Sequence, residues 1–429
     1  MNILVVGGGG REHAIIWKLA QSPRAKKIYC APGNGGIAHL AECVDIGATD
    51  IDGILSFAKN AHVDLVVIGP DDPLALGLAD ACEAAGIHAF GPVKAAARLE
   101  WSKSYAKDLM RKYGIPTAGY QVFENAADAI AAIASADARP PFVVKTDGLA
   151  LGKGVVVTED RAEAEAAVRS IMLDKIYGDS GARIVLEEYL TGPEMTVLAF
   201  TDGHTIKPMP CSQDHKRAFD GDLGPNTGGM GAFAPSPIYT EAVARECWER
   251  IYAPTLGMMR AEGIRYRGIL YFGLMLTEGG VKVIEYNARF GDPETQVVLP
   301  LLKSDLLEII DAVIDERLDS VEPEWESGFA ACVIAASGGY PGPYKTGYEV
   351  SIARSLDPDI CPTDGGVMVF HAGTREEGGR LVTSGGRVLG VTALGGNLGD
   401  ALERAYGGIL HVSFNEMRYR KDIGGYRQA

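Results

Sequence analysis

The chain has 429 residues, of which 47% are hydrophobic and 23% charged, and its formal net charge is -15 at pH 7. This length suggests about two to four domains, and the composition is that of an ordinary globular protein with ample core. The negative charge argues against general nucleic-acid binding or a polybasic membrane contact. Anionic ligands must therefore be met by local backbone amides and by particular Lys and Arg side chains.

Cysteine usage and the first residues bear on the compartment. The seven cysteines are scattered without a C-x-x-C pair, so neither a disulfide framework nor a zinc site is supported. Residues 2–6 are typical of a strand directly after Met1, which leaves no room for a signal peptide, and no apolar run of about 18 residues exists. We expect a soluble, untargeted protein of the reducing cytoplasm.

Residues 1 to about 92 alternate strand and helix patterns. Buried apolar strands are predicted at Ile3–Val6, Lys27–Ala31, Val63–Ile68 and Ile87–Phe90, with a helix at Glu12–Gln21 after the first. Apolar strands separated by helices predict a parallel, doubly wound sheet.

Two glycine-rich loops follow the first two strands, at Gly7–Gly10 and Pro32–Gly36. Ligands of such sheets bind at the carboxyl ends of the strands, and the first loop opens a helix whose amides can hold a phosphate. The G-x-G-x-x-G fingerprint fails, because its last glycine would fall on Glu12 or His13. We therefore favour a small phosphorylated ligand over NAD, and a simple tight turn is the alternative.

A second unit begins after the Gly91–Pro92 break, with a helix predicted at Ala95–Tyr113. Lys103 and Lys107 lie one helical turn apart on it, and taken in isolation a solvated basic face is the default interpretation of that spacing.

A hairpin follows, with strands Pro141–Lys145 and Val155–Val157 around a glycine-rich loop. This loop is no Walker A sequence, because Asp147 occupies the first glycine position and Gly154 follows Lys153. It could be a mobile flap that closes over nucleotide phosphates, with Lys145 as a point charge, or a plain hairpin with a flexible tip.

The stretch Arg183–Glu194 is typical of a buried strand that ends in acidic residues and a Gly-Pro turn. Such a segment could offer backbone groups to an adenine edge and a carboxylate to ribose hydroxyls. Residues Asp214–Arg217 and Gly224–Gly231 then form a long polar, glycine-dense region, and loops of this length are usually functional.

A second hairpin is predicted from Gly268–Leu276 and the strand that starts at Val281. Alternation on that strand places Glu285, Asn287 and Arg289 on one face. The other face carries Ile284, Tyr286, Ala288 and Phe290 and should pack. A carboxylate and an amide oxygen two residues apart suit Mg²⁺, which takes further ligands from water and substrate phosphates. A solvated polar face is the alternative, but residues 290–294 bring more carboxylates directly afterwards.

The last hundred residues change composition and predict a small β-rich α+β domain. Strands are expected at Phe329–Ala336, Val367–His371, Leu381–Thr383 and Val388–Thr392, and a helix at Leu398–Tyr406. His371 could approach the site, although a histidine satisfied within a turn is the simpler interpretation.

Seven segments in order, spread over essentially the whole chain, resemble one family. They are GGREHA at 9–14, PGN at 32–34, VVKTDGLALGKGV at 143–155, LEEYLTGPE at 186–194, DHKR at 214–217, GPNTGGMG at 224–231 and RFGDPE at 289–294. The chain is similar to the phosphoribosylamine-glycine ligases (glycinamide ribonucleotide synthetases) of the ATP-grasp superfamily. RFGDPE is the most specific of the seven.

This resemblance implies a multidomain protein of α/β and α+β units. The expected parts are an N-terminal doubly wound domain at 1–101 for the phosphoribosyl substrate, an ATP-grasp domain at 102–325, and a C-terminal α+β domain at 326–429. The ATP-grasp domain would include a flap subdomain at about 120–190.

The resemblance also implies roles for individual residues. Lys145 and Arg289 are expected to be catalytic, and Glu285 and Asn287 to hold Mg²⁺ or Mn²⁺. The expected ATP-binding residues are Lys103, Lys107, Lys145, Gly152, Lys153, Gly154, Glu187, Glu188, Leu190 and Glu194. The expected substrate-binding residues are Gly8, Gly9, Gly10, Pro32, Gly33, Asn34, Asp214, Lys216, Asn226, Thr227, Gly228, Asp292 and Glu294. Many other ATP-grasp enzymes carry a further metal carboxylate on the preceding strand, but Gly268–Leu276 has none.

The implied activity is ATP-dependent ligation of glycine to 5-phosphoribosylamine through glycyl phosphate, by a cytoplasmic monomer without nucleic-acid or membrane partners. A nicotinamide oxidoreductase is the rival enzyme class, and the failed fingerprint disfavours it. A non-catalytic phosphoribosyl-binding regulator would not need Glu285, Asn287 and Lys145 together.

Overall fold

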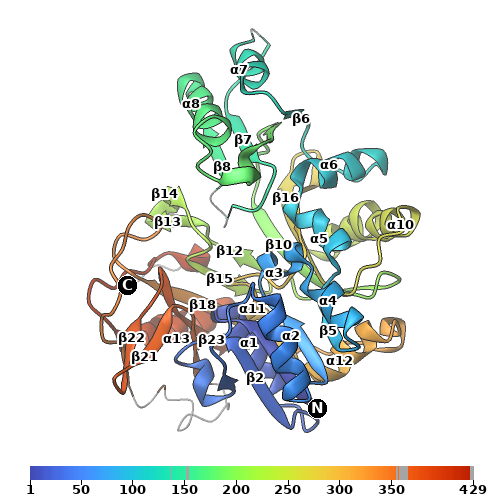
Figure 1. The fold of residues 1–429 in the computed structure, drawn as a ribbon. Helices are drawn as coiled ribbons and strands as arrows, with labels where there is room; N and C mark the ends of the chain where they lie inside the picture. The colour runs from blue at the N-terminus through green and yellow to red at the C-terminus, as the bar shows by residue number, and fades with distance from the viewer. Residues whose placement is uncertain (136, 151–153, 354–355, 357–365, 426–429) are drawn as a thin grey trace.

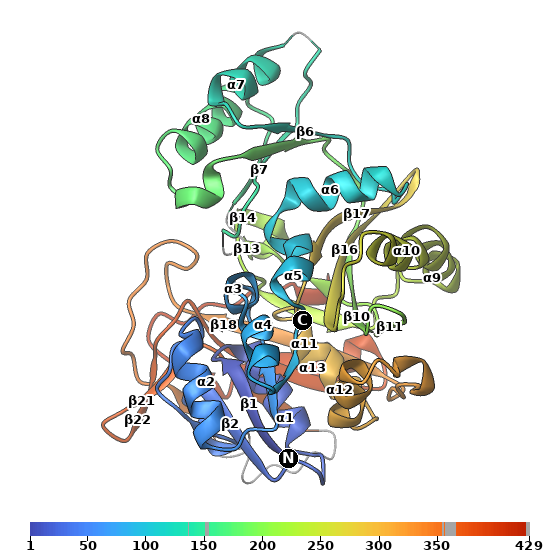
Figure 2. The same cartoon turned by 45° about the vertical axis from the view of Figure 1, so that its right-hand side comes forward.

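The computed structural model describes residues 1–135, 137–150, 154–353, 356 and 366–425. Figures 1 and 2 show a small flap unit at the top, a central unit below it, and the N-terminal and C-terminal units side by side at the bottom. Within these described ranges no helix combines the length and the apolar character needed to cross a membrane.

The N-terminal unit is a five-stranded parallel sheet in the order β3-β2-β1-β4-β5. Its elements are β1 (Asn2–Gly7), α1 (Gly10–Leu19), β2 (Lys27–Pro32), η1 (Ile37–His39), β3 (Glu42–Cys43), α2 (Ile51–Asn60), β4 (Leu65–Ile68), α3 (Asp71–Leu76), α4 (Leu78–Ala84) and β5 (His88–Phe90). Leu4 and Val6 join a core with α2 and α4, whereas Ile3 and Val5 join a core with α1 and α12 (Leu306–Ile314). Helices cover both faces, so the predicted doubly wound sheet is confirmed; among its strands, the short β3 was not predicted.

The helix predicted at Ala95–Tyr113 is in fact two helices, α5 (Lys94–Trp101) and α6 (Lys103–Lys112). Ser102 is extended between them, and its hydroxyl accepts a hydrogen bond from the Tyr105 amide as the N-cap of α6. A serine can cap a helix as well as sit inside one, and the apolar period alone did not reveal which it does here. The break places Lys103 at the first position of α6.

The flap unit is a four-stranded antiparallel sheet in the order β6-β9-β7-β8 with two helices. Its elements are β6 (Tyr120–Phe123), α7 (Ala126–Ala134), β7 (Phe142–Thr146), β8 (Val155–Thr158), α8 (Arg161–Met172), η2 (Gly178–Gly181) and β9 (Ile184–Glu187). It has a small core of its own, which includes Ile133, Val144, Val168 and Ile184. This independence from the larger cores explains why the unit stands apart in both views.

The central unit is an antiparallel sheet in the order β11-β10-β16-β17. Its strands are β10 (Glu194–Thr201), β11 (Ile206–Pro208), β16 (Gly268–Thr277) and β17 (Gly280–Asn287). The predicted hairpin is therefore present as β16 and β17. Beside it, α9 (Glu241–Cys247) runs through a π-helical segment, Trp248–Tyr252, into α10 (Ala253–Ala261).

The C-terminal sheet has the order β12-β15-β18-β23-β20. β18 (Phe329–Ala336), β20 (Val367–His371) and β23 (Arg387–Gly395) carry α13 (Leu398–Ile409) as predicted. The other two strands, β12 (Gln213–Asp214) and β15 (Gly231–Ala234), precede residue 325. This sheet is therefore assembled from both sides of the expected boundary at 325–326.

Short elements complete the described chain. They are the hairpin β13 (Arg217–Phe219) and β14 (Leu223–Asn226) with η3 (Asp220–Asp222) between them, α11 (Thr295–Val298), η5 (Leu299–Leu301), η6 (Leu318–Ser320), the pair β19 (Ser351–Ile352) and β24 (Val412–Ser413), the hairpin β21 (Thr374–Glu377) and β22 (Arg380–Thr383), and η8 (Ile423–Gly425).

Candidate active site

A cavity of about 1100 Å³ lies where the flap, the central hairpin and the C-terminal sheet face one another. Most of the predicted nucleotide and metal residues line it. They are Lys103, Lys107, Lys145, Gly154, Glu187, Glu188, Leu190, Glu194, Glu285, Asn287 and Arg289. The predicted substrate residues Asp214, Lys216, Asn226, Thr227, Gly228, Asp292 and Glu294 line the same cavity. Gly152 and Lys153 lie outside the described residues.

A buried charge cluster stands on the flap side of this cavity. Nζ of Lys107 and Nζ of Lys145 each lie 3.0 Å from the same carboxylate oxygen, Oε2 of Glu187. Burial, together with the charge of Lys145, lowers the pKa of Lys107 to about 8, although Glu187 opposes the shift. The second oxygen of Glu187 is buried without a partner among the described residues. Two lysines thus share one carboxylate, which leaves a net positive charge that suits a phosphate chain.

The start of α6 is held to the flap loop by Asp147. Its Oδ1 accepts from the Ser104 amide at 2.6 Å and its Oδ2 from the Ser104 hydroxyl at 2.8 Å. Arg183 of the flap lies 2.7 Å from the same carboxylate. Asp147, which broke the Walker A pattern, therefore accepts hydrogen bonds from the first turn of α6.

Strand β17, on which metal ligands are predicted, differs from its prediction at one position. The register with β16 shifts between Gly273 and Leu274, so that Glu285 pairs with Gly273 while Val283 pairs with Leu274, and Ile284 is the extra residue of a β-bulge. Val281, Val283 and Tyr286 are buried in the core, whereas Ile284 is only partly buried and lines the cavity. The prediction that Ile284 packs on the opposite face from Glu285 is wrong, because the bulge interrupts the alternation.

Charges around this strand keep its carboxylate ionised. Burial alone would favour a proton on Glu285, but Lys216, Lys145 and Lys103 outweigh it and lower its pKa. Oδ1 of Asn287 accepts a hydrogen bond from Nη2 of Arg289 at 3.2 Å. Among the residues that the structure describes, no group of three or more His, Cys, Asp or Glu could hold a metal. A hard cation held by one charged and one neutral protein oxygen would take most of its coordination sphere from water and phosphate oxygens.

Glu100 is a site residue that the sequence did not reveal. It lies in the last turn of α5, with Oε1 3.0 Å from Nη2 of Arg289 and Oε2 2.7 Å from the Ala288 amide. Burial raises its pKa to about 7, while Arg289 opposes the shift. Glu100 therefore fixes the guanidinium that faces the cavity.

A second ionic group surrounds Lys216 on the floor of the cavity. Its Nζ lies 2.8 Å from Oε2 of Glu194, and this charge is the main reason why the pKa of Glu194 is lowered. Burial raises the pKa of Asp214 to about 7, against the pull of Lys216. Glu294 is 3% exposed and accepts a hydrogen bond from the Tyr271 hydroxyl at 3.0 Å. The pKa values of Glu194 and Asp214 are therefore shifted in opposite directions within one pocket.

A smaller cavity, of about 380 Å³, lies at the two predicted glycine loops. Gly8, Gly9, Gly33 and Asn34 line it, whereas Gly10 and Pro32 do not. The loops are in direct contact: the Gly33 amide donates to the Gly7 carbonyl at 3.1 Å, and a Cβ on Gly8 would lie 2.5 Å from the Gly33 carbonyl oxygen.

The side chain of Asn34 holds the glycine loops and the C-terminal unit together. Its amide group donates to the carbonyl oxygens of Gly8, at 2.9 Å, and His371, at 2.8 Å. His371 itself supports this junction through its main chain, and its ring bonds to Thr374 at 3.1 Å.

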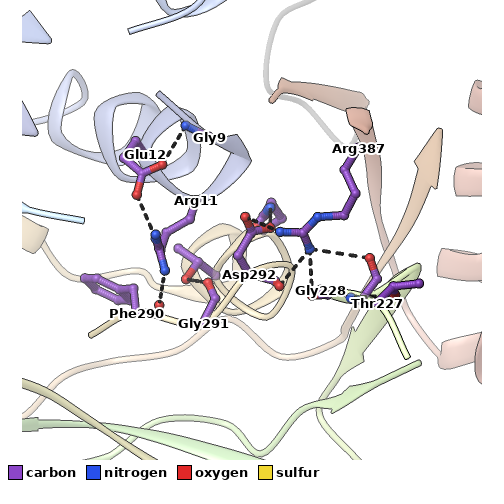
Figure 3. Close-up of polar contacts among 12 residues, drawn as sticks. Gly9, Arg11, Glu12, Thr227, Gly228, Phe290, Gly291, Asp292 and Arg387 are labelled. Atoms are coloured by element: carbon purple, nitrogen blue, oxygen red, sulfur yellow. Dashed lines mark hydrogen bonds and ion pairs between the residues drawn. The ribbon is translucent and has the colours of Figure 1, made fainter. Parts of the chain in front are cut away.

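The helix that follows the first loop uses one of its own acids as a cap. The Gly9 amide donates to Oε2 of Glu12 at 2.6 Å, and Arg11 reaches from Glu12 to the Phe290 carbonyl at 2.9 Å (Figure 3). The amide of Gly9 is thus satisfied by Glu12, and Arg11 links the loop to the segment that follows β17.

The cleft between two sheets, the paired buried lysines on its flap side, and the carboxylate and amide on the opposite strand are the arrangement of an ATP-grasp enzyme. Family models agree with this class. Residues 1–100, 101–295 and 330–426 match the N domain, the ATP-grasp (A) domain and the C domain of phosphoribosylglycinamide synthetase. The chain belongs to the phosphoribosylglycinamide synthetase family.

Individual relatives agree over the full length. The chain is 49% identical to the phosphoribosylamine–glycine ligase of Caulobacter vibrioides, with 99% of this chain and 98% of that one covered. It is 46% identical to the corresponding ligase of Caldanaerobacter subterraneus, with 99% and 100% covered. The crystal structure of phosphoribosylamine–glycine ligase from Thermotoga maritima matches with a TM-score of 0.83 at 33% identity, over 99% of this chain and 100% of that chain.

More distant structures share the fold alone. The biotin carboxylase domain of the Hydrogenobacter thermophilus 2-oxoglutarate carboxylase matches with a TM-score of 0.73 at 16% identity, over 97% of this chain and 91% of that one. The expected fold class is thereby confirmed for all three parts of the chain.

Proposed function

We propose that this protein ligates glycine to 5-phosphoribosylamine at the expense of ATP, giving glycinamide ribonucleotide, ADP and phosphate in purine biosynthesis. One observation carries the proposal. The cavity that holds the lysine cluster and the Glu285–Asn287 pair shares lining residues with the cavity of the two glycine loops. A nucleotide and a phosphorylated sugar can therefore be bound next to each other, as a ligation between them requires.

The reaction needs an activated carboxylate. Glycine's carboxylate is a poor electrophile, so its oxygen first attacks the γ-phosphorus of ATP, ADP leaves, and glycyl phosphate forms. The amine then attacks the glycyl carbon, the bond from that carbon to the phosphate oxygen breaks, and phosphate departs with the amine's proton. Phosphoryl transfer of this kind depends on positioning and charge stabilisation, and no Ser, Cys or His nucleophile is required.

The described residues supply those two functions. Lys145 and Lys107 would hold the phosphate chain, and Arg289, fixed by Glu100, would stabilise charge on the transferring group. Gly154, Glu187, Glu188, Leu190 and Glu194 would bind the rest of the nucleotide together with Lys103. The predicted Gly152 and Lys153 would extend this set. A closed flap would keep water from glycyl phosphate.

A divalent cation fits the pair of ligands on β17. Glu285 is kept ionised by its lysine neighbours, and the Asn287 oxygen beside it is neutral, which is the donor set that Mg²⁺ or Mn²⁺ accepts alongside phosphate oxygens. Such an ion would neutralise charge on the phosphates. We propose Glu285 and Asn287 as its protein ligands.

The substrate side is divided between the two cavities. We propose that Gly8, Gly9, Gly33 and Asn34, with the flanking Gly10 and Pro32, bind the phosphoribosyl group. Asp214, Lys216, Asn226, Thr227, Gly228, Asp292 and Glu294 would bind glycine and the reacting end of the sugar. Functionally, residues 1–101, 102–325 and 326–429 would act as the phosphoribosyl, ATP-grasp and C-terminal domains of a cytoplasmic monomer.

ADP release with each substrate omitted in turn tests this function. We expect ADP only when glycine is present, and rapidly only when phosphoribosylamine, made in situ from ribose 5-phosphate and ammonia, is also present. Equal ADP release with unrelated amino acids would refute the glycine assignment. Sedimentation of the purified chain would test the monomer.

A further inference from the structure

The two cavities meet at three residues, Asp292, Tyr340 and Arg387, which line both of them. Asp292 follows strand β17, whereas Tyr340 and Arg387 come from the C-terminal unit. Arg387 is the first residue of β23. An amine in the glycine-loop cavity and an acyl phosphate in the larger cavity would both lie beside this junction. Its geometry therefore bears on the second half of the proposed reaction.

The guanidinium of Arg387 binds both the main-chain carbonyl and the side-chain carboxylate of Asp292. Nη1 donates to the Asp292 carbonyl at 2.9 Å, and Nη2 lies 2.8 Å from Oδ2 of the carboxylate (Figure 3). The guanidinium is a rigid planar fork, so two bonds to one residue fix its orientation as well as its position. The Asp292 carboxylate is held in place by the C-terminal unit.

The same guanidinium also holds the loop on the other side of the junction. Nη1 donates to the Gly228 carbonyl at 2.7 Å, and the Gly228 amide donates to the Tyr340 hydroxyl at 3.1 Å. Arg387 thus binds the carbonyl group of Gly228, and Tyr340 binds its amide group. The loop at Gly228 and the segment at Asp292 are kept at a fixed separation.

The Asp292 carboxylate can accept further hydrogen bonds on the side of the glycine loops. Oδ1 accepts from Nε2 of Gln296 at 2.7 Å and Oδ2 from Arg387, while a carboxylate has about four lone-pair sites. Oδ2 also lies 3.7 Å from where a Cβ on Gly9 would be. The carboxylate therefore borders the cavity in which the phosphorylated sugar would lie.

We propose that Arg387 is a positioning residue for the amine-transfer step. It fixes Asp292 so that this carboxylate accepts a hydrogen bond from the amine of phosphoribosylamine and directs the nitrogen lone pair at the glycyl carbon. The carbon–nitrogen bond forms, the carbon–oxygen bond to phosphate breaks, and the amine's proton leaves with the phosphate. This inference rests on the proposed function.

The test compares Arg387→Met and Arg387→Lys with the wild type. Arg387→Met should lower kcat/KM for phosphoribosylamine about 10²-fold, the effect of losing the geometry of a reacting group. The Kd for ADP, measured by calorimetry, should change less than about twofold, as for a separate site. Arg387→Lys keeps the charge but not the fork and should fall between. It also serves as the test should Arg387→Met fail to fold in a thermal melt.

A double-variant cycle shows whether Arg387 acts through Asp292. Asp292→Asn alone should lose about as much as Arg387→Met, and the double variant should lose no more than either. Arg380→Met is the matched control, because Arg380 makes an exposed ion pair with Glu349 in the same C-terminal unit and should behave as wild type.

Three outcomes would overturn the inference: an ADP Kd weakened by the same factor as kcat/KM, an unchanged kcat/KM, or losses that multiply in the double variant. The first would show that Arg387 only supports the fold of the nucleotide site. A wild type that consumes no ATP with glycine and phosphoribosylamine would instead refute the proposed function, so the two failures are distinguishable.

Discussion

Nη2 of Arg289 is shared between Oδ1 of Asn287, at 3.2 Å, and Oε1 of Glu100, at 3.0 Å. The amide oxygen proposed as a metal ligand is thus oriented by the guanidinium proposed to stabilise the transferring phosphoryl group. A cation bound at Asn287 would therefore have to contact Oδ1 of Asn287 without displacing the Arg289 guanidinium from Glu100. The two roles are coupled through one nitrogen.

Asn287→Leu removes the oxygen and should therefore abolish rescue by metal. We expect turnover to fall at least about 10²-fold and to stay low when Mg²⁺ is raised or Mn²⁺ substituted, because no ligand atom is left at this position. Asn287→Asp, which keeps an oxygen, is the control and should retain metal-dependent activity. The measurement is the metal concentration for half-maximal rate. Recovery of Asn287→Leu at high Mn²⁺ would show that Asn287 does not bind the ion.

Glu285→Gln should leave the fold intact and weaken the metal site. We expect the free energy of unfolding to change within about 1 kcal/mol, since the side chain is nearly isosteric. Turnover should drop roughly 10²-fold because a carboxylate charge is lost next to the phosphates. Added Mg²⁺ or Mn²⁺ should restore part of it, because the amide oxygen can still bind.

Glu278→Gln, on the exposed turn of the same hairpin, is its matched control and should change neither quantity. Wild-type turnover of Glu285→Gln at limiting Mg²⁺ would mean that Glu285 is only a polar residue of the strand.

The affinity for nucleotide should depend on the ionisation of Lys107. Burial lowers the pKa of Lys107 from 10.5 to about 8, so the ammonium that attracts phosphate is nearly complete well below pH 8 and is lost as the pH rises through 8. We expect the Kd for ATP to be constant on the acidic side and to rise by up to about tenfold per pH unit above pH 8, as loss of one proton requires.

The variant Lys107→Arg should remove this dependence, since a guanidinium stays charged throughout the range. Lys112→Arg, an exposed change on the same helix, should preserve it. Titrations of ATP from pH 6.5 to about 9.5 would decide. A Kd for wild type that is flat across pH 8 contradicts the assignment of Lys107 to the phosphate chain.

Gly9→Val should damage the phosphoribosyl site selectively. A Cβ on Gly9 would lie 2.8 Å from Oε2 of Glu12, so the cap of α1 must shift where the sugar phosphate would lie. We expect a large rise in KM for phosphoribosylamine with little change for ATP. Gly47→Val, at a position with open space around it, is the control. An equal loss of ATP binding would place the loop in the nucleotide site.

Local patterns in the sequence were sufficient for most of the fold. Buried apolar runs located the parallel sheet, the flap hairpin, and the β16–β17 hairpin, because period and turn residues are local properties. The break at Ser102 was missed because a serine inside a helical pattern is compatible with both a cap and a continued helix. The bulge at Ile284 was missed because register depends on the partner strand, which the strand's own sequence does not specify.

The site was predictable where a motif carried it and unpredictable where it depended on distant contacts. Lys145, Glu285 and Asn287 lie in segments with recognisable chemistry. Arg387 is 95 residues from Asp292 in the chain, and its own surroundings read as an ordinary strand start. Glu100 looked like one more polar residue of a helix, and only the fold brings it to Arg289.

The mixed origin of the C-terminal sheet also limits how the chain can be divided. β15, at Gly231–Ala234, hydrogen-bonds along β18, at Phe329–Ala336. A chain shortened at residue 325 would keep β15 but lose its neighbour β18. The apolar edge of β15, which is buried in the full-length chain, would then be exposed to solvent. Such edges pair with other chains, so the truncated product should self-associate instead of folding as an isolated catalytic fragment. The last hundred residues are thus a structural requirement of the preceding part, and not an appendage to it.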